Sequence, residues 1–530
     1  MRADERWVSI PGLVRARAQD FADQDAIVDE AGVHLAYRDL LPLMVRSTKA
    51  AIASGLQAGD RASIWAPNVH EWIAAALGIL GAGGVVVPLN TRFKGAEAAY
   101  VLGKSRARTL FTVNGFLGTD YVSMLRDANV ELPALEHVVV LRGTVPDGSV
   151  GFDDYLAAGD EIIDSDALSR IDDIDSDDVS DIIFTSGTTG HPKGAIVTHG
   201  QSLRVYEAWT DVIGLRAGDR YLIVNPFFHT FGYKAGWMSC ILRGATIVPF
   251  QVFDVPKVLS MVERERISVL PGPPTLLQSI LDEPDRSRYD LSSLRLTVTG
   301  AAAVPVKLIE RLRDEMTFET IITGYGLTET TGTAAMCRHD DDPETIANWS
   351  GRAIPDTELR VVDDDGQEVP NGQPGEVMVR GYNVMRGYFE EPAETAAAID
   401  AEGWLHTGDV GVMNAQGYVR ITDRMKDMFI VGGFNAYPAE IENLLLANDA
   451  VAQVAIVGVP DDRLGEVGMA FVVPRPGATI DPDEFIAWSR DQVANYKVPR
   501  YAEVVDALPL NASGKVLKYE LRDRARARRR

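Results

Sequence analysis

Short apolar runs alternate with amphipathic stretches along most of this chain, and that alternation limits the folds open to it. Asp181–Phe184, Arg220–Val224 and Leu294–Val298 have the length and composition of strands, whereas Gln201–Ile213 and Val255–Arg266 repeat with a helical period. Strands that alternate with helices form sheets whose faces are covered by helices. The sequence therefore predicts an α/β fold.

The pattern changes in the last third of the chain. Glu358–Asp363, Gly375–Arg380 and Gly417–Thr422 read as short strands separated by Gly, Pro, Asp and Asn, which predicts a β-rich subdomain at about 356–424. From about residue 427 a compact α+β unit follows, with helices expected at Ala439–Asn448 and Asp483–Tyr496. We therefore expect a large N-terminal part and a small C-terminal one.

Charge and cysteine content exclude several classes of protein. The 530 residues include 52 basic and 76 acidic side chains, a net charge of −24, which keeps a chain soluble and repels nucleic acid and anionic membranes. Only two cysteines are present, so no disulfide framework is expected. The N-terminus is charged from Arg2 onward and lacks the apolar core of a signal peptide, which predicts a cytoplasmic protein.

Two segments allow a second interpretation. The uncharged run Trp72–Leu89 is nearly as long as a membrane span, but its glycines and Pro88 favour a helix through Leu80 followed by a buried strand at Val85–Val87. The aspartate-rich segment Ile163–Asp181 matches no calcium loop, and we expect a solvated linker there. We expect neither nucleic-acid nor integral-membrane partners, and a homodimer is possible.

A glycine- and hydroxyl-rich segment, Thr185–Gly194, directly follows a predicted strand. Its glycines allow a tight turn and close approach to a ligand, its hydroxyls and amides offer donors to phosphate oxygens, and Lys193 adds a positive charge. Lys193 is followed by Gly194, which excludes a Walker A loop. Composition alone leaves a phosphate-binding loop and an ordinary hairpin turn as alternatives.

This segment, TSGTTGHPKG, resembles the signature loop of the adenylate-forming acyl-CoA synthetases. Four further motifs follow in the order of that family: Gly324-Tyr325-Gly326-Leu327-Thr328-Glu329, Trp404-Leu405-His406-Thr407-Gly408-Asp409, Asp423-Arg424-Met425-Lys426-Asp427 and Asn511-Ala512-Ser513-Gly514-Lys515. The resemblance implies a ligase that activates a carboxylic acid with ATP and Mg²⁺, forming acyl-AMP and pyrophosphate, and then transfers the acyl group to CoA.

The same resemblance assigns roles to individual residues. Lys515 would bridge the substrate carboxylate and the α-phosphate, Thr328 would contact a phosphate oxygen, and Glu329 with Thr188 would hold Mg²⁺ through hard oxygen atoms. Tyr325 offers a flat face for adenine, and Asp409 is suited to the ribose hydroxyls. The residues expected to bind ATP or AMP are Thr185, Ser186, Gly187, Thr188, Thr189, Gly190, Lys193, Gly300, Ala301, Ala302, Gly324, Tyr325, Gly326, Asp409 and Arg424.

The family reorients its C-terminal domain between the two half-reactions. By resemblance, residues 1–424 form the adenylation domain, residues 425–530 form the mobile domain, and the hinge lies at about 424–427 with Lys426 as its pivot. Gly432, Gly433 and Phe434 would line the tunnel for the pantetheine arm of CoA. Asp423 departs from the glycine that the family often has before its hinge arginine.

A further motif bears on which acid the chain would activate. Asn225–Tyr233 is similar to the acyl-pocket motif, with His229 at the carboxylate end and Phe231, Tyr233 and Trp237 able to wall a bulky apolar tail. Strings such as NPFFHTFGYKAG and GVPDDRLGEVG resemble actinobacterial ligases that activate the propanoate side chain left on the C and D rings during steroid degradation. A medium-chain fatty or aryl acid, or transfer to a carrier-protein thiol, is the alternative. A nucleotide-binding protein without catalysis is disfavoured by the intact Lys515, Glu329 and Asp409.

Overall fold

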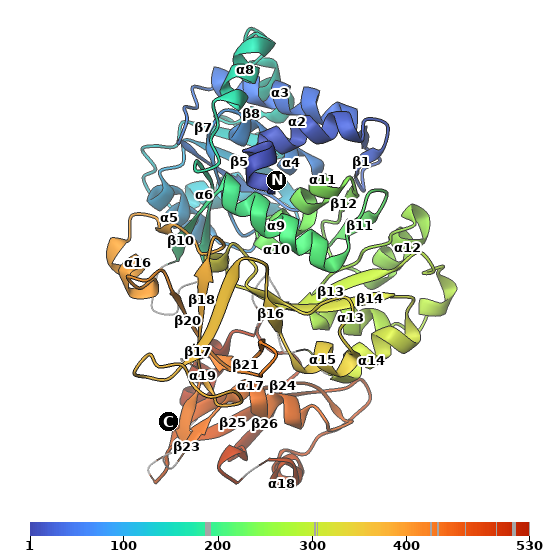
Figure 1. Cartoon of the computed structure of the whole chain (residues 1–530), viewed down its shortest axis with the longest axis vertical. Helices are drawn as coiled ribbons and strands as arrows, with labels where there is room; N and C mark the ends of the chain where they lie inside the picture. Colours follow the sequence, from blue (N-terminus) through green and yellow to red (C-terminus); the bar gives the residue numbers. More distant parts are fainter. Residues whose placement is uncertain are drawn as a thin grey trace.

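The structure, a computed structural model, has a large body and a smaller one below it in the orientation of Figure 1. It describes residues 1–185, 192–300, 304, 306–424, 427–431, 434–461, 463–493, 495–510 and 516–528. At Asp423, Arg424, Phe434, Asn435, Glu440 and Asp491 it describes the backbone alone. The α/β class predicted from the alternation of apolar runs is confirmed.

A nine-stranded, largely parallel sheet carries the segment expected to bind phosphate. Its order is β19–β10–β9–β4–β3–β5–β7–β8, with β6 paired to β5. The strands are β3 (Arg61–Trp65), β4 (Val85–Pro88), β5 (Thr109–Phe116), β6 (Thr119–Asp120), β7 (His137–Arg142), β8 (Val150–Gly151), β9 (Val179–Thr185), β10 (Lys193–Thr198) and β19 (Gly387–Tyr388). Strand β9 runs parallel to β4, whereas β10 is antiparallel to both of its neighbours, β9 and β19. Segment 186–192 therefore connects two neighbouring antiparallel strands at the carboxyl end of β9.

A smaller sheet and several helices complete this part of the core. The order β11–β12–β1–β2 joins β1 (Asp25–Val28), β2 (His34–Ala36), β11 (Arg220–Ile223) and β12 (Thr246–Pro249). Helix α4 (His70–Gly81) packs on α3 (Tyr37–Ala53), and every residue from Trp72 to Gly81 is buried. The uncharged run is thus a core helix followed by β4, as its glycines predicted. Among the described residues, no helix combines the length and the apolar character needed to cross a bilayer.

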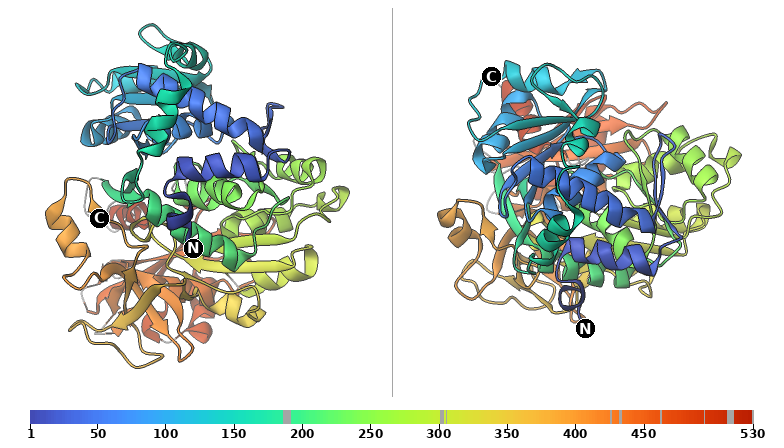
Figure 2. Two further views of the ribbon diagram at one scale, coloured as in Figure 1. Left: turned by 45° about the horizontal axis from the view of Figure 1, so that its top comes forward. Right: turned by 90° about the horizontal axis from the view of Figure 1, so that it is seen from above.

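An eight-stranded mixed sheet lies beside these two sheets (Figures 1 and 2). Its order β13–β14–β15–β16–β21–β20–β18–β17 joins β13 (Leu296–Gly300), β14 (Thr320–Tyr325), β15 (Ala335–Met336), β16 (Gly351–Ala353), β17 (Thr357–Val362), β18 (Gly375–Gly381), β20 (Leu405–Met413) and β21 (Tyr418–Arg424). The strands predicted for a separate β-rich subdomain therefore share a sheet with β13 and β14. The short strands β15 and β16 make the connection by pairing with β14 and β21.

The smaller body begins after β21 and has its own core. A five-stranded sheet contains β22 (Phe429–Val431), β23 (Phe434–Ala436), β24 (Val451–Asp461), β25 (Gly465–Pro474) and β26 (Tyr501–Val504), with helices α17 (Pro438–Leu445), α18 (Pro482–Gln492) and α19 (Lys518–Arg528). Its apolar cluster, which runs in sequence from Phe429 to Ala525, is distinct from that of the large body. The described contacts between the bodies include α17 against β21 and an ion pair between Lys307 and Asp449 at 3.7 Å.

The remaining helices lie mainly around the large body. They are α1 (Ala3–Trp7), α2 (Ile10–Asp20), α5 (Gly95–Ser105), α6 (Tyr121–Asp127), α7 (Phe152–Ala157), α8 (Asp164–Asp172), α9 (His199–Ile213), α10 (Thr230–Gly232), α11 (Ser239–Arg243), α12 (Val255–Glu265), α13 (Pro274–Leu281), α14 (Val306–Glu315), α15 (Pro343–Asn348) and α16 (Pro392–Ala398), with a π-helical turn η1 (Tyr233–Met238) and 3₁₀ turns η2 (Arg286–Arg288), η3 (Thr328–Thr330) and η4 (Asn495–Lys497).

The prediction of a solvated linker at Ile163–Asp181 is wrong for Asp164–Asp172, because α8 forms there. Asp164 and Asp166 lie in the first turn of α8, where negative charge is favourable beside the helix dipole. Ala167 and Ile171, four residues apart, are both buried on one face of the helix. The aspartates thus start an amphipathic helix, and its packing depends on apolar partners outside the segment.

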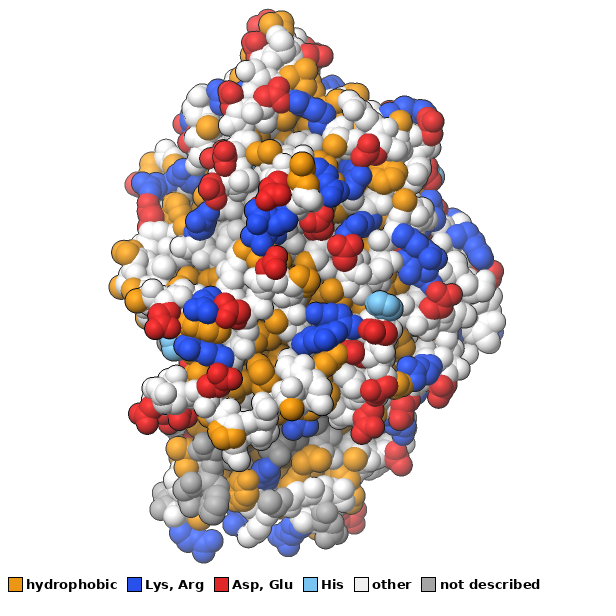
Figure 3. Space-filling view, in the orientation of Figure 1, with side chains coloured by type: hydrophobic (Ala, Val, Ile, Leu, Met, Phe, Trp, Pro, Cys, Tyr) orange, Lys and Arg blue, Asp and Glu red, His pale blue; other side chains and the backbone are white. Residues whose placement is uncertain are grey.

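The surface carries both signs of charge despite the net charge of −24. Figure 3 shows Lys and Arg side chains interspersed with Asp and Glu over the face drawn. Many are paired, as Arg311 is with Asp282 at 2.8 Å and with Glu315 at 2.7 Å. Exposed pairs of this kind contribute little stability individually. The excess of acid is therefore dispersed on this face.

Candidate functional site

The residues expected to bind the nucleoside meet where the end of β14 lies against the middle of β20. The Tyr325 hydroxyl donates a hydrogen bond to Oδ2 of Asp409 at 2.6 Å, although 84 residues separate them in the chain. Asp409 is 2% exposed, whereas Tyr325 is partly exposed. Arg424 is directly opposite Asp409 across the β20–β21 ladder. The sheet thus gathers an aromatic ring, a carboxylate and the backbone of Arg424 at one place.

Glycines keep the surface beside Tyr325 flat. Gly300 and Gly324 are partners across the parallel β13–β14 pair, and a Cβ on Gly300 would lie 2.7 Å from the carbonyl oxygen of Gly324. A Cβ on Gly326 would lie 2.3 Å from the carbonyl oxygen of Gly332. Both distances are too short for any side chain. The bare backbone here is a steric requirement of the fold, and it leaves a surface against which a planar base can lie.

Glu329 lies in turn η3, next to the strand that leads into the phosphate segment. Its Oε1 accepts a hydrogen bond from the Tyr388 hydroxyl at 2.9 Å and one from Oγ1 of Thr185 at 3.4 Å. Thr328, one residue earlier, is partly exposed in the same turn. Tyr388 is buried enough, and close enough to the Glu329 charge, that the pKa of its hydroxyl is raised, so it stays a donor. Thr185 and Glu329 are therefore brought together by the fold.

Sequence reasoning missed Tyr388. It lies on β19, which pairs with β10 at Ala195, the residue directly after Gly194. Nothing in the spacing of a tyrosine 59 residues after Glu329 signals a contact. Only the addition of β19 to the edge of the nine-stranded sheet brings it there.

Lys193, on the first residue of β10, is held from two sides. Its ammonium forms an ion pair with Glu394 of α16 and lies 5.3 Å from the centroid of the Tyr388 ring. Glu394 is another residue that sequence reasoning missed. In the same region, the Tyr100 hydroxyl donates to the carbonyl oxygen of Pro192 at 3.3 Å. The predicted phosphate ligand is thus fixed by a counter-charge on a surface helix.

His229 begins the short helix α10, and its Nδ1 accepts a hydrogen bond from the amide of Phe231 at 3.2 Å. Protein surrounds most of the ring although one part is exposed, and this burial lowers the pKa of His229 to about 4. The imidazole is therefore neutral near pH 7, with its proton on Nε2 because Nδ1 is an acceptor. A neutral Nε2–H donor is suited to a carboxylate oxygen.

The three aromatic residues predicted for the acyl pocket differ in exposure. Phe231 is partly exposed, whereas the side chains of Tyr233 and Trp237 are 0% exposed. Tyr233 stacks on Trp237 with ring centroids 5.0 Å apart, and Trp72 of α4 meets both rings edge-on. Of the three, Phe231 alone has exposed surface, and it packs against the apolar cluster to which Tyr233 and Trp237 belong.

Several predicted site residues lie outside the described residues, and the structure says nothing of them. They are Ser186, Gly187, Thr188, Thr189, Gly190, Ala301, Ala302, Lys426, Gly432, Gly433 and Lys515, together with the side chains of Arg424 and Phe434. Their described neighbours are paired: Val431 with Phe434 in the β22–β23 hairpin, and Leu510 with Val516 across an isolated bridge.

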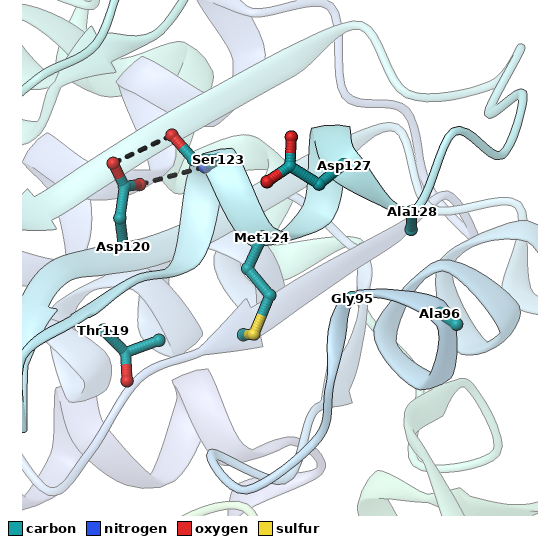
Figure 4. A pocket seen from close by; sticks show the side chains of 8 residues that line it. All are labelled: Gly95, Ala96, Thr119, Asp120, Ser123, Met124, Asp127 and Ala128. Atoms are coloured by element: carbon teal, nitrogen blue, oxygen red, sulfur yellow. Dashed lines mark hydrogen bonds between the residues drawn. The ribbon is translucent and has the colours of Figure 1, made fainter.

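Two other hollows in the large body are lined by different residues. Figure 4 shows one between α5 and α6, where both carboxylate oxygens of Asp120 accept hydrogen bonds from Ser123 as a helix cap. The other has a volume of about 410 Å³ and includes Arg142, which is already bound to Asp29 and Glu71 at 2.8 and 2.7 Å. Asp120 in the first hollow and Arg142 in the second are thus already paired with other residues of the protein.

A large α/β body with a nucleoside-type site, followed by a small unit with a separate core, is the architecture of adenylate-forming enzymes. Residues 14–389 match the family described as AMP-binding enzyme, and residues 440–515 match the AMP-binding enzyme C-terminal domain. The chain belongs to the AMP-binding enzyme family.

Its relatives narrow the activity. The chain is 48% identical over 523 residues to the 3-[(3aS,4S,7aS)-7a-methyl-1,5-dioxo-octahydro-1H-inden-4-yl]propanoyl:CoA ligase of Rhodococcus jostii (strain RHA1), covering 98% of this chain and 99% of that one. It is 47% identical to the ligase of the same name from Mycobacterium tuberculosis (strain ATCC 25618 / H37Rv), covering 97% and 98%. Among solved structures, the anthranilate CoA ligase AuaEII in complex with anthranoyl-AMP matches with a TM-score of 0.89 and 28% identity over 99% of both chains. The chain is therefore an AMP-forming acid–CoA ligase that uses ATP and CoA.

Proposed function

We propose that this ligase activates a bulky alicyclic propanoate derived from the C and D rings of a steroid. The observation that carries the proposal is the near-full-length identity of 48% and 47% to two actinobacterial ligases named for such a propanoate. The partly exposed Phe231 beside His229 offers an apolar face next to a neutral hydrogen-bond donor. An acid of this kind needs an apolar surface for its rings and a hydrogen-bond donor for its carboxylate.

The proposed reaction has two steps. A carboxylate oxygen of the acid attacks the α-phosphorus of ATP, which releases pyrophosphate and gives acyl-AMP. The CoA thiol then attacks the acyl carbon and displaces AMP. Asp409 would accept hydrogen bonds from the ribose, Tyr325 would stack on adenine, and His229 would orient the acid. Lys515 would stabilise the charge that develops between carboxylate and phosphate in the first step.

The described part of the site suits Mg²⁺, the cation that we propose. The Glu329 carboxylate and the Thr185 hydroxyl provide hard oxygen donors side by side, which is the ligand type that Mg²⁺ prefers. Thr188, the other proposed donor, lies outside the described residues. A cation bound there would neutralise part of the phosphate charge. The carboxylate, itself an anion, could then approach the negatively charged ATP.

We further propose that residues 1–424 and 425–530 move as two units about Lys426, and that Gly432, Gly433 and Phe434 line the path of the CoA arm. Two features support this boundary. Arg424 ends the last strand of the eight-stranded sheet, and Phe429 starts the first strand of the five-stranded one. The small body also has a separate apolar core, as a unit that rotates rigidly requires. A cytoplasmic location and a possible homodimer remain predictions.

A second candidate substrate class is an aryl or medium-chain fatty acid. The match to an anthranilate CoA ligase over 99% of both chains favours the aryl alternative. Pyrophosphate release should be measured with ATP and Mg²⁺ across a panel of a bicyclic steroid-derived propanoate, octanoate and benzoates, each with and without CoA. We expect the highest kcat/KM with the propanoate. A higher value with octanoate or a benzoate would overturn the proposed substrate, and acyl-AMP formation without transfer to CoA would favour a carrier-protein acceptor.

A further inference from the structure

A lysine with no exposed surface lies inside the predicted acyl-pocket motif. Lys234 belongs to the π-helical turn η1, and its side chain is 0% exposed. Its Nζ lies 2.8 Å from Oδ1 of Asp181 on β9, whose side chain is also 0% exposed. Lysine and aspartate are almost never fully buried unless they are paired. Solubility explains charged side chains on a surface, but it does not explain why this pair is buried.

The other groups around the pair are neutral, so Lys234 is the counter-charge of Asp181 among the described residues. Oδ2 of Asp181 accepts a hydrogen bond from the Ser180 hydroxyl at 2.7 Å. Nζ of Lys234 lies 5.8 Å from the centroid of the Tyr233 ring, a neutral partner. His199 is buried nearby, where burial and the Lys234 charge lower its pKa to about 3, so it too is neutral. Among the described residues, no second cation forms an ion pair with Asp181.

The pair joins the two segments that must be aligned for adenylation. Asp181 precedes Thr185 by four residues on the strand that leads into the phosphate segment. Lys234 follows Phe231 by three residues and His229 by five. No other described ion pair links β9 to η1. A shift of one segment relative to the other would change the distance between the acid and the α-phosphate.

The local backbone does not hold this geometry by itself. η1 is not one regular helix, because a kink at Gly236 interrupts it. Gly236 within it has φ −91° and ψ −106°, outside the helical region. A Cβ on Gly232 would lie 2.2 Å from the carbonyl oxygen of Pro226, so the preceding turn is closed tightly on itself. The position of the whole turn is therefore set by contacts to other elements.

We propose that Lys234 and Asp181 are positioning residues: their buried ion pair fixes the His229–Phe231 turn relative to the phosphate segment and so aligns the acid carboxylate with ATP. The inference rests on the proposed placement of the acid beside His229. It concerns the first half-reaction, because an acyl group already joined to AMP no longer needs this alignment.

The test separates alignment from folding. Lys234→Met alone leaves Asp181 buried without its counter-charge and is expected to destabilise the protein. The double variant Asp181→Asn/Lys234→Met removes both charges, which is often neutral for stability. We expect this double variant to keep the melting temperature and the ATP affinity of the wild type. Its rate of acyl-AMP formation should fall at least about tenfold, since misplacement of reacting groups by about 1 Å can cost 10²-fold. Transfer from pre-made acyl-AMP to CoA should stay within about twofold.

Lys257→Met, which removes an exposed lysine of α12, is the matched control and should change neither step. A wild-type rate of acyl-AMP formation in the double variant would overturn the proposal, because the pair would then serve stability alone.

A second variant covers the case in which the double variant does not fold. Ser180→Ala removes the hydrogen bond to Asp181 without removing a charge. That variant must slow acyl-AMP formation at least about threefold at unchanged ATP affinity, and an unchanged rate overturns the proposal. All rates use the acid that the wild type prefers, so a different natural acid changes the proposed substrate and leaves this test valid.

Discussion

At the scale of single residues, the contact between Tyr325 and Asp409 predicts how ATP affinity depends on each. Asp409→Ala should weaken ATP binding by about 1.5–3 kcal/mol, the range for hydrogen bonds to a charged group, whichever acid is supplied. Tyr325→Phe keeps the ring and removes only the hydroxyl that bonds to Asp409, so it should lose about 1 kcal/mol. Calorimetric titration with ATP measures both. Altered acid preference at unchanged ATP affinity would contradict the role of Asp409.

Tyr388 predicts a second effect at this scale, on the proposed cation. Its hydroxyl holds Oε1 of Glu329, and Tyr388→Phe removes that donor without changing the ring near Lys193. We expect the Mg²⁺ concentration for half-maximal acyl-AMP formation to rise about tenfold or more, since a hydrogen bond to a charged carboxylate contributes about 1.5–3 kcal/mol. Tyr519→Phe, at an exposed tyrosine of α19, is the control. An unchanged Mg²⁺ requirement in Tyr388→Phe would remove Tyr388 from the site.

The buried His199 and the largely enclosed His229 predict how stability changes at acidic pH. Burial lowers the pKa of His199 to about 3 and that of His229 to about 4, against about 6.5 in the unfolded chain. Between these values and 6.5 the unfolded chain binds protons that the folded chain does not, so stability falls as the pH falls from about 6.5 towards 4, by up to about 1.4 kcal/mol per pH unit for each histidine. His199→Gln keeps an acceptor for the Ile10 amide and should make urea unfolding less pH-dependent in this window. An identical pH slope would show that His199 is protonated in the folded state.

At the scale of elements, the close packing of α4 on α3 depends on a glycine. A Cβ on Gly78 would lie 2.7 Å from Cβ of Ser47 and 2.8 Å from its carbonyl oxygen. Gly78→Ala should therefore destabilise the protein by about 1–3 kcal/mol, the usual cost of overpacking. Gly103→Ala, on the exposed face of α5 with its nearest atom 3.6 Å away, should instead stabilise by about 0.5–1 kcal/mol, because alanine is the better helix former. Urea denaturation distinguishes the two signs, and equal effects would refute the steric argument.

At the scale of the whole molecule, the two bodies predict that the half-reactions can be separated. Lys515→Ala should slow acyl-AMP formation by about 10²–10³ and spare transfer from pre-made acyl-AMP, because the lysine acts on charge in the first step only.

The proposed hinge gives a second prediction at this scale. Lys426→Pro fixes φ near −65°, so the hinge can no longer adopt two backbone states. We expect acyl-AMP to accumulate while acyl-CoA production falls. Single-turnover quenches resolve the two products. Equal slowing of both steps by Lys426→Pro would indicate misfolding, and no slowing would place the hinge elsewhere.

The sequence by itself determined the features that depend on neighbours in the chain. The alternation of apolar runs predicted the α/β class, the glycines after Leu80 separated α4 from β4, and the ordered motifs predicted the family. These signals are local, because a strand, a turn or a glycine-rich loop is specified by residues within a few positions of one another.

Only the tertiary structure decided which distant residues meet. The Asp-rich segment gains α8 because Ala167 and Ile171 find apolar partners elsewhere. Strands β17, β18, β20 and β21 join β14 through two short strands that carry little pattern of their own. The contacts of Glu329 with Tyr388 and of Asp181 with Lys234 span 59 and 53 positions, and no spacing rule links such pairs. Long-range pairing depends on the shape of the whole core. The sequence could therefore predict the motif residues that carry the chemistry, but it could not predict the distant residues that hold them in place.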